Sequence, residues 1–131
     1  MIGLDTNVLV RYIMQDDPRQ SPKATRLIES LDLERPGFVA VVAVVELYWV
    51  LTSCYGLGGH DVKRALETLL RSKQIVVDRA DQVLRALRVF GDGKADFADC
   101  LIERIASSAG CDETVTFDAG ASKDAGMSLL R

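Results

Sequence analysis

Two acidic residues at opposite ends of this 131-residue chain each follow a short apolar segment. Segment 1–4 runs into Asp5, and segment 114–117 runs into Asp118. Carboxylates that follow strands in an alternating α/β chain usually face the crevice in which ligands bind. Each of the two has an ordinary alternative role as a helix cap or turn residue. Their shared context makes both candidates for one site.

Glu46 is a third candidate, because it is the one strongly polar residue in the apolar run 38–51. A buried, unpaired carboxylate is costly or takes up a proton, so a chain keeps one there when something compensates it. The alternative is a partly exposed glutamate in the first turn of a helix, where the helix dipole favours it. This residue alone leaves the two interpretations about equal.

Asp96 and Asp99 complete the acidic set. They are three residues apart, so on a helix they share one face. Asp99 is followed by the apolar residues 100–102, which predicts that it faces inward as a site acid. Asp96 is near the expected helix start, so we expect a helix cap or an auxiliary metal ligand.

If these carboxylates converge, their repulsion raises at least one pKa, and a divalent cation removes that penalty. All-oxygen ligands suit Mg²⁺ or Mn²⁺. Such an ion activates water and neutralises a phosphoryl oxygen, which predicts metal-assisted hydrolysis of a phosphodiester. Thr6, Asn7 and Thr116 lie beside the acids and are candidates for orienting ligands or water. The candidate catalytic residues and metal ligands are Asp5, Glu46, Asp99 and Asp118, with Asp96 as an auxiliary metal ligand.

The pattern of apolar residues predicts strands that alternate with helices. Such alternation indicates a mainly parallel sheet covered by helices on both faces, in one domain spanning 1–131. A helix over 43–55 follows the second strand, and another over 96–109 carries the acid pair. The expected strands are 1–4, 38–42, 74–77 and 114–117, with a fifth at 127–130.

Composition excludes several classes of protein. No apolar run reaches the ~18 residues that a membrane helix needs, and Met1 leads directly into an apolar segment, so we expect neither a membrane helix nor a signal peptide. We therefore expect a cytoplasmic protein without a membrane partner. The three cysteines form no CxxC pair and His60 is the single histidine, which argues against zinc and against a Ser-His-Asp triad. The net charge of −3 argues against broad electrostatic binding of nucleic acid.

The order of four motifs resembles the PIN domain, specifically the VapC-type toxin ribonucleases of bacterial toxin–antitoxin pairs. The matching segments span nearly the whole chain: 4–10 (LDTNVLV), 45–51 (VELYWVL), 96–102 (DFADCLI) and 116–118 (TFD). The resemblance implies a PIN-like three-layer α/β/α fold, with a central parallel sheet of four or five strands between helices. It also implies the site named above, with Asp96 nearby and Thr116 at a hydroxyl position beside the last acid.

Family members typically use Mg²⁺ or Mn²⁺ to cut RNA, form homodimers and are inhibited by a VapB-type antitoxin. The resemblance implies these properties for this chain. One departure stands out: relatives often carry a serine or threonine just before the helix with the glutamate, whereas residues 39–45 contain no hydroxyl group.

Our main hypothesis is therefore a metal-dependent endoribonuclease that acts as the toxin of a toxin–antitoxin pair. The candidate phosphate contacts are Arg11, Lys23, Lys94 and Arg104. One alternative is a non-catalytic PIN-like module that binds RNA or protein. A second is a receiver-like signalling domain, which would be expected to show an acidic pair after its first strand, where Asp5 stands alone.

Overall fold

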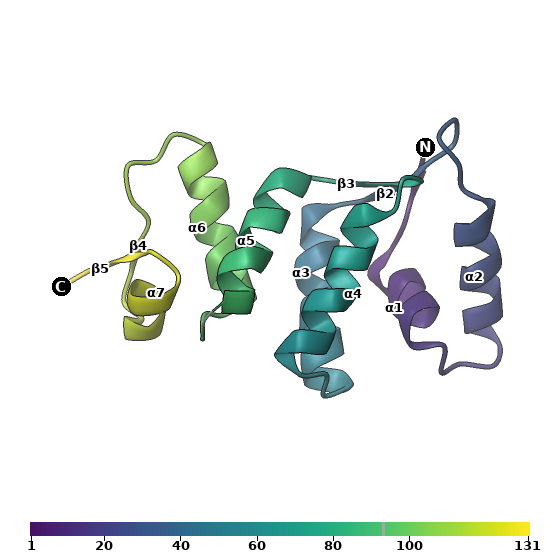
Figure 1. The fold of residues 1–131 in the computed structure, drawn as a ribbon, viewed down its shortest axis with the longest axis horizontal. Coiled ribbons are helices and arrows are strands. Elements are labelled where there is room, and N and C mark those ends of the chain that lie inside the picture. The colour runs from purple at the N-terminus through teal and green to yellow at the C-terminus, as the bar shows by residue number, and fades with distance from the viewer. Residues whose placement is uncertain (93) are drawn as a thin grey trace. The chain divides into compact units, whose positions relative to one another are not determined.

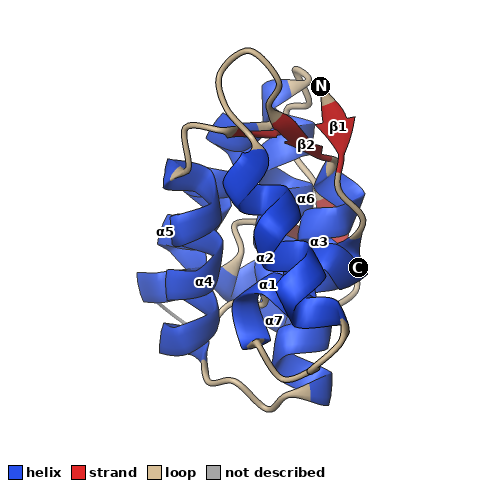
Figure 2. Ribbon diagram, turned by 90° about the vertical axis from the view of Figure 1, so that its right-hand side faces the viewer, coloured by secondary structure: helices blue, strands red, loops and turns tan. Residues whose placement is uncertain are grey.

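The computed structural model describes residues 1–92 and 94–131. These residues form two compact units, Met1–Asp78 and Arg79–Arg131. Figure 1 draws the chain with its helices and strands labelled. The strands are short and most of the ordered backbone is helical, as the colours of Figure 2 show.

The N-terminal unit is built on a three-stranded parallel sheet with the order β1-β2-β3. The strands are β1 (Ile2–Gly3), β2 (Gly37–Val39) and β3 (Ile75–Val77). The helices are α1 (Thr6–Met14), α2 (Gln20–Ser30), α3 (Val41–Trp49) and α4 (Gly59–Arg71), and a π-helical segment, Val50–Cys54, continues α3.

The apolar core of this unit follows the predicted helical spacing. The side chains of Leu9, Ile28, Leu47 and Leu66, one from each helix, are almost completely buried, and Val39 of β2 is fully buried. Within α4 the buried residues Val62, Leu66 and Leu69 are three or four positions apart, so they lie on one face of the helix. Burial of Leu9 and Leu47 holds α1 and α3 in place, and both helices carry predicted site residues.

The boundary between β2 and α3 differs from the prediction. The strand ends at Val39 and the helix begins at Val41, two residues before the predicted start. Ala40 occupies the N-cap position without a side-chain hydrogen bond. The backbone N–H of Val41 instead lies 3.4 Å from a carboxylate oxygen of Asp78, at the end of β3. A residue distant in sequence thus supplies an acceptor at the helix start, where Ser, Thr, Asp or Asn usually does.

The described residues of the C-terminal unit form three helices and a two-stranded parallel sheet. Its elements are α5 (Ala80–Asp92), α6 (Phe97–Ser108), β4 (Val115–Thr116), α7 (Ala119–Asp124) and β5 (Ser128–Leu129). Helices α5 and α6 pack together, and the rings of Phe90 and Phe97 meet edge to face with centroids 6.2 Å apart. The predicted helix that carries Asp96 and Asp99 is confirmed, with Asp96 as its cap.

The predicted α/β class and parallel strand pairing are confirmed. All five predicted strands are present. They pair as a three-stranded sheet in the first unit and a two-stranded sheet in the second, where the resemblance implied one central sheet of four or five strands. No helix in residues 1–92 or 94–131 is long and apolar enough to cross a membrane. The prediction of one domain over 1–131 remains a prediction.

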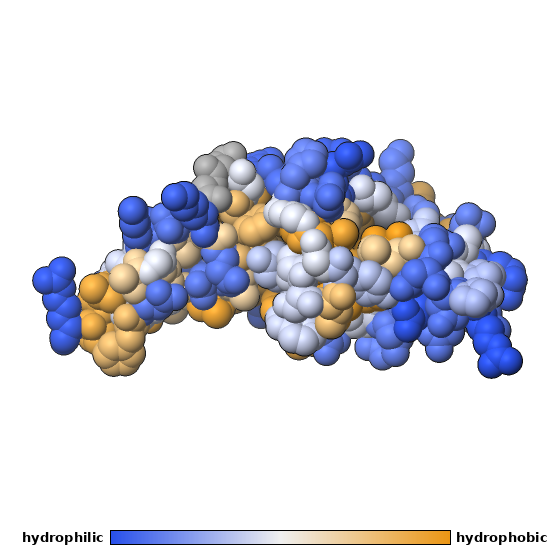
Figure 3. All heavy atoms as spheres, turned by 90° about the horizontal axis from the view of Figure 1, so that it is seen from below, coloured by the Kyte–Doolittle hydropathy of each residue, from blue (hydrophilic) through white to orange (hydrophobic). Residues whose placement is uncertain are grey.

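Exposed apolar side chains gather at the C-terminal strands. They form the orange region at the left-hand end of Figure 3, next to the C-terminus. Phe117 is 81% exposed, directly before Asp118. The others on these strands and just after β5 are Val115, Leu129 and Leu130.

Candidate functional site

Asp5 connects the first strand to the first helix. Its carboxylate oxygen Oδ1 accepts a hydrogen bond from the backbone N–H of Thr6 at 2.8 Å, so Asp5 is the N-cap of α1. The helix-cap role that the sequence allowed for Asp5 is therefore confirmed. It does not consume the carboxylate, because the side chain is exposed and lines a cleft. Asp5 can both begin the helix and offer an oxygen to a ligand.

Glu46 lines the same cleft from α3. It lies in the second turn of the helix and is exposed, so the interpretation as a buried carboxylate is wrong. The hydroxyl group of Thr6, which is almost completely buried, donates a hydrogen bond to Glu46 Oε1. This contact joins the first acid segment to the glutamate helix. Residues 39–45 lack a hydroxyl group, and Thr6 brings one to the glutamate instead.

The cleft has a volume of about 440 Å³ and is referred to here as the acid cleft. It brings together five residues that the sequence singled out, namely Asp5, Thr6, Asn7, Arg11 and Glu46. Val10 and Val50 form apolar parts of the wall, and Tyr55 contributes a phenol ring. Two carboxylates, one guanidinium and a hydroxyl donor therefore border one open space in the N-terminal unit.

The other three acids lie in the C-terminal unit. Asp96 caps α6 by accepting a hydrogen bond from the backbone N–H of Asp99 at 3.1 Å. Asp118 caps α7 by accepting one from the backbone N–H of Gly120 at 2.9 Å. Thr116 Oγ1 accepts a hydrogen bond from the backbone N–H of Asp118 at 3.0 Å, which orients the backbone at this acid.

The three acids of this unit interact electrostatically. The pKa of Asp99 is raised above its ordinary value, first because the side chain is partly buried and then because Asp96 and Asp118 repel its charge. Asp99 is half-buried, as predicted for the inward-facing acid of the pair. A cation beside Asp99 would favour its ionised form.

A site for Mg²⁺ or Mn²⁺ needs several oxygen ligands close together. Among the described residues, no group of three or more His, Cys, Asp and Glu side chains is close enough together to hold a metal ion. The donor chemistry fits, because carboxylate oxygens are what Mg²⁺ and Mn²⁺ prefer, and the charge on Asp99 is already disfavoured. Ligation by these acids remains a prediction.

The four predicted phosphate contacts differ in their surroundings. Arg11 lines the acid cleft and lies 3.4 Å from Asp16. Arg104 is paired with the neighbouring Glu103 through two hydrogen bonds of 2.6 and 2.8 Å, which occupy its guanidinium group. Lys23 and Lys94 are exposed.

Sequence reasoning missed two features of the acid cleft. Tyr55 is the last residue of the predicted helix over 43–55, yet its ring lines the cleft directly after the π-helical segment Val50–Cys54. Asp16 was not a candidate, yet its Oδ2 accepts a hydrogen bond from the Tyr55 hydroxyl group at 2.8 Å. No local pattern marks either residue, because both contacts join segments that are far apart in sequence.

Comparison with known proteins shows the family to which this chain belongs. The sequence model of the PIN domain matches residues 2–125, nearly the whole chain, so this chain belongs to the PIN domain family. Among solved structures the chain is similar to VapC20 of Mycobacterium tuberculosis, a toxin that cleaves the Sarcin-Ricin loop. The two chains share 20% sequence identity and a TM-score of 0.48, over 100% of this chain and 99% of that one. No curated protein matches the chain.

Proposed function

We propose that this protein is a Mg²⁺- or Mn²⁺-dependent endoribonuclease that hydrolyses RNA phosphodiester bonds. The candidate catalytic acids are Asp5, Glu46, Asp99 and Asp118, with Asp96 in an auxiliary role. One observation carries the proposal: Asp5 and Glu46, from separate segments, line one open cleft and are joined through Thr6. Membership of the PIN domain family supports it.

The side chains have separable roles in this mechanism. The metal ion, when bound, supplies positive charge that stabilises a phosphoryl group and acidifies water. Thr6 holds the carboxylate of Glu46, and the cap at α1 holds that of Asp5. Thr116 orients the backbone at Asp118, and a nearby cation would offset the repulsion by Asp96 and Asp118 that helps to raise the pKa of Asp99. Asn7 lines the acid cleft and can orient substrate or water.

The finer biological role follows from the resemblance of the four motif segments to VapC-type toxins. We propose that the protein is the toxin of a type II toxin–antitoxin pair, acts in the cytoplasm, forms a homodimer and is held inactive by a VapB-type antitoxin. A small open reading frame directly upstream of the gene, whose product co-purifies with this chain, is the expected finding.

The decisive experiment is an RNA cleavage assay on protein freed of any bound partner, with Mg²⁺, Mn²⁺ or EDTA. Asp5→Asn and Asp118→Asn remove a charge but keep the cap acceptor, so the helices still form. We expect each to lower cleavage by at least about 100-fold, the upper end of the loss seen when a residue that only supports a metal ligand is replaced.

Asp32→Asn is the matched control, because Asp32 also accepts backbone hydrogen bonds, from Glu34 and Arg35, but lies in an exposed turn. It should cleave like the wild type. If wild-type protein cuts no RNA and binds neither metal, the enzymatic proposal is wrong. Retained RNA binding without cleavage would then favour the non-catalytic module. The receiver-like alternative does not agree with the family match.

A further inference from the structure

A second cleft adjoins the acid cleft in the N-terminal unit. It has a volume of about 270 Å³ and lies between α1 and α2, and it is referred to here as the lysine cleft. Asn7 and Arg11 line both clefts. Lys23 stands at the lysine cleft, and Val8, Ala24 and Leu27 form apolar parts of its wall. The two clefts are therefore neighbours that share a border at Arg11.

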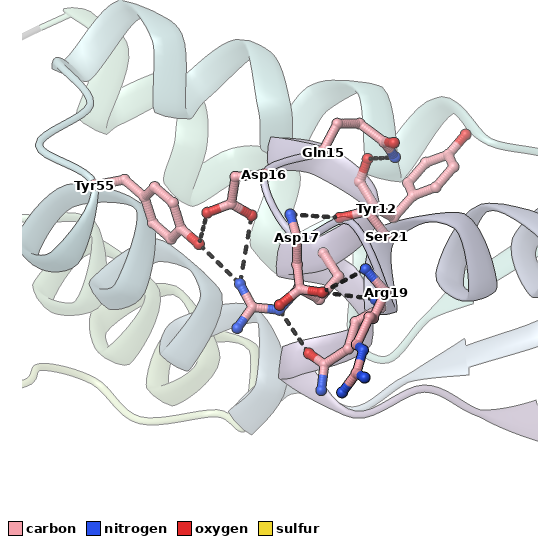
Figure 4. A network of polar contacts seen from close by, with 9 residues as sticks. Tyr12, Gln15, Asp16, Asp17, Arg19, Ser21 and Tyr55 are labelled. Carbon is pink, nitrogen blue, oxygen red and sulfur yellow. Dashed lines mark hydrogen bonds and ion pairs between the residues drawn. The ribbon is translucent and has the colours of Figure 1, made fainter.

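Arg11 is held in position by a polar network, drawn in Figure 4 around Tyr55 and Asp16. Its Nη1 donates to the Tyr55 hydroxyl oxygen at 3.2 Å and lies 3.4 Å from Asp16 Oδ1. Its Nε donates to Gln20 Oε1 at 2.8 Å. The Tyr55 hydroxyl group donates to Asp16 Oδ2 at 2.8 Å, so both partners of Nη1 are themselves linked.

This arrangement leaves a donor free on a fixed guanidinium. Among the described residues, Arg11 Nη2 has no hydrogen-bond acceptor. Lys23 likewise forms no salt bridge within the described part of the chain, and it is exposed. Phosphate is the ligand that suits both groups, because a planar guanidinium offers paired donors and an ammonium offers a point charge.

We propose that the acid cleft continues across Arg11 into the lysine cleft, and that this track binds the phosphate backbone of the RNA on one side of the cleaved bond. Arg11 and Lys23 contact phosphates, and Tyr55 and Asp16 are positioning residues for Arg11. The apolar walls accommodate sugars and base edges without selecting a sequence. This inference rests on the proposed function for the identity of the substrate, and it adds a direction and a set of contacts.

Salt dependence of binding tests the track separately from cleavage. A short fluorescein-labelled single-stranded RNA is titrated in EDTA and followed by fluorescence anisotropy over a series of NaCl concentrations. Each phosphate contact contributes about 0.7 to the slope of log K against log salt for single strands. We expect Arg11→Gln and Lys23→Gln each to reduce the slope by about 0.7 and to weaken binding by about fivefold, the effect of one charge pair in water.

Three further variants make the result specific. Arg64→Gln removes one positive charge from an exposed site on α4 that does not line the acid cleft or the lysine cleft, so it should keep the wild-type slope. Tyr55→Phe keeps the positive charge of Arg11 but removes the hydroxyl group that holds its guanidinium. We therefore expect weaker RNA binding with an unchanged salt slope. Arg11→Lys should restore the slope that Arg11→Gln loses. Far-ultraviolet circular dichroism checks that each variant is folded, and Lys23→Gln breaks no hydrogen bond or salt bridge within the described residues.

The outcomes separate the two proposals. The proposed track is wrong if Arg11→Gln and Lys23→Gln have the same salt slope as Arg64→Gln, even if the wild type cleaves RNA. Wild-type protein that does not bind the RNA at low salt also overturns it. Reduced slopes in protein that never cleaves RNA support the track and contradict the enzymatic proposal instead. A loss that differs between two unrelated RNA sequences of equal length contradicts a backbone track.

Discussion

The Thr6 hydroxyl group connects two segments of the chain through a single hydrogen bond. Thr6 begins α1, is 6% exposed, and donates to the carboxylate of Glu46 on α3. A hydrogen bond to a charged group from a buried donor fixes the direction in which that carboxylate presents its second oxygen. Thr6 therefore sets the position of an acid without itself having to contact the substrate.

Replacing Thr6 tests this role. Thr6→Val keeps the shape of the side chain and removes the donor. We expect it to lower the free energy of unfolding by about 1 kcal/mol, because the exposed carboxylate of Glu46 regains water. Cleavage should fall further than stability explains, mainly through kcat, and Thr6→Ser should restore most of it. Equal activity of Thr6→Val and the wild type at full folding would contradict the positioning role.

The ionised form of Asp99 is disfavoured by its surroundings in the C-terminal unit. Burial and the charges of Asp96 and Asp118 raise its pKa. Asp99→Asn removes the charge, so in EDTA at neutral pH we expect it to increase stability, by less than about 1 kcal/mol because the site is only partly buried. Urea unfolding measures the effect. In the cleavage assay the same substitution should be inactive, so stability and activity change in opposite directions.

Helix α2 illustrates how a single carboxylate organises an element. Asp17 Oδ1 accepts hydrogen bonds from the backbone N–H groups of Gln20 at 2.7 Å and Arg19 at 2.9 Å, and its own N–H donates to Ser21 Oγ at 3.3 Å. Ser21 is itself buried. These bonds satisfy N–H groups that no helical turn can reach. They fix the start of α2, which carries Lys23 toward the lysine cleft.

The same bonds predict how stability depends on pH. The hydrogen bonds from Gln20 and then Arg19, together with the charge of Arg11, lower the pKa of Asp17 below its ordinary value of 3.8. The folded protein therefore binds fewer protons than the unfolded chain in that range, and stability rises with pH. The contribution is complete above the unfolded pKa and is lost as the pH falls through the folded pKa.

Urea unfolding at neutral and acidic pH measures this contribution. We expect Asp17→Asn to be less stable than the wild type at neutral pH and to approach it below about pH 3. Glu34→Gln, which changes an exposed acid in the loop before β2, is the control and should follow the wild type throughout. A difference between Asp17→Asn and the wild type that is constant with pH would argue against the ionised cap.

The π-helical segment that continues α3 affects the direction of the residue that follows it. Such a segment winds more slowly than an α-helix and so turns the following residues to another face, and π-helical turns are frequent at functional sites. Here it is followed by Tyr55, whose ring lines the acid cleft and whose hydroxyl group contacts Arg11. An α-helix over the same residues would aim this side chain elsewhere.

At the scale of the whole molecule, the chain divides into two compact units, each with its own parallel strands. A single domain over 1–131 predicts that both unfold in one transition. Trp49 is the one tryptophan and lies in the first unit, so its fluorescence reports on that unit, whereas far-ultraviolet circular dichroism reports on all helices.

We expect the two urea unfolding curves to share one midpoint. Separate midpoints would show two domains. Adding Mn²⁺ should raise the midpoint of the wild type, because a ligand that binds only the folded state stabilises it. At a concentration of 100 times its Kd, the ion adds about 2.7 kcal/mol to the free energy of unfolding. Asp5→Asn and Asp118→Asn should each show a smaller increase.

The sequence by itself determined the order of the elements and singled out the candidate acids. Strand-end aspartates, the spacing of Asp96 and Asp99, and an isolated glutamate in an apolar run are local patterns, and the order of the motifs indicated the PIN family before any geometry was known. The periodicity of buried residues also located the helices, because local hydrophobic spacing decides which face is buried.

Only the tertiary structure decided what these residues contact. The hydrogen bond from Thr6 to Glu46, the acceptor that Asp78 offers to α3, and the contact of Tyr55 with Arg11 each join segments far apart in the chain. Such contacts depend on side-chain direction after the sheet and helices have packed, and no periodicity encodes them. Two acids at opposite ends of the chain could be recognised from sequence as candidates, but a role for Asp5 beside Glu46 became visible only in the folded cleft.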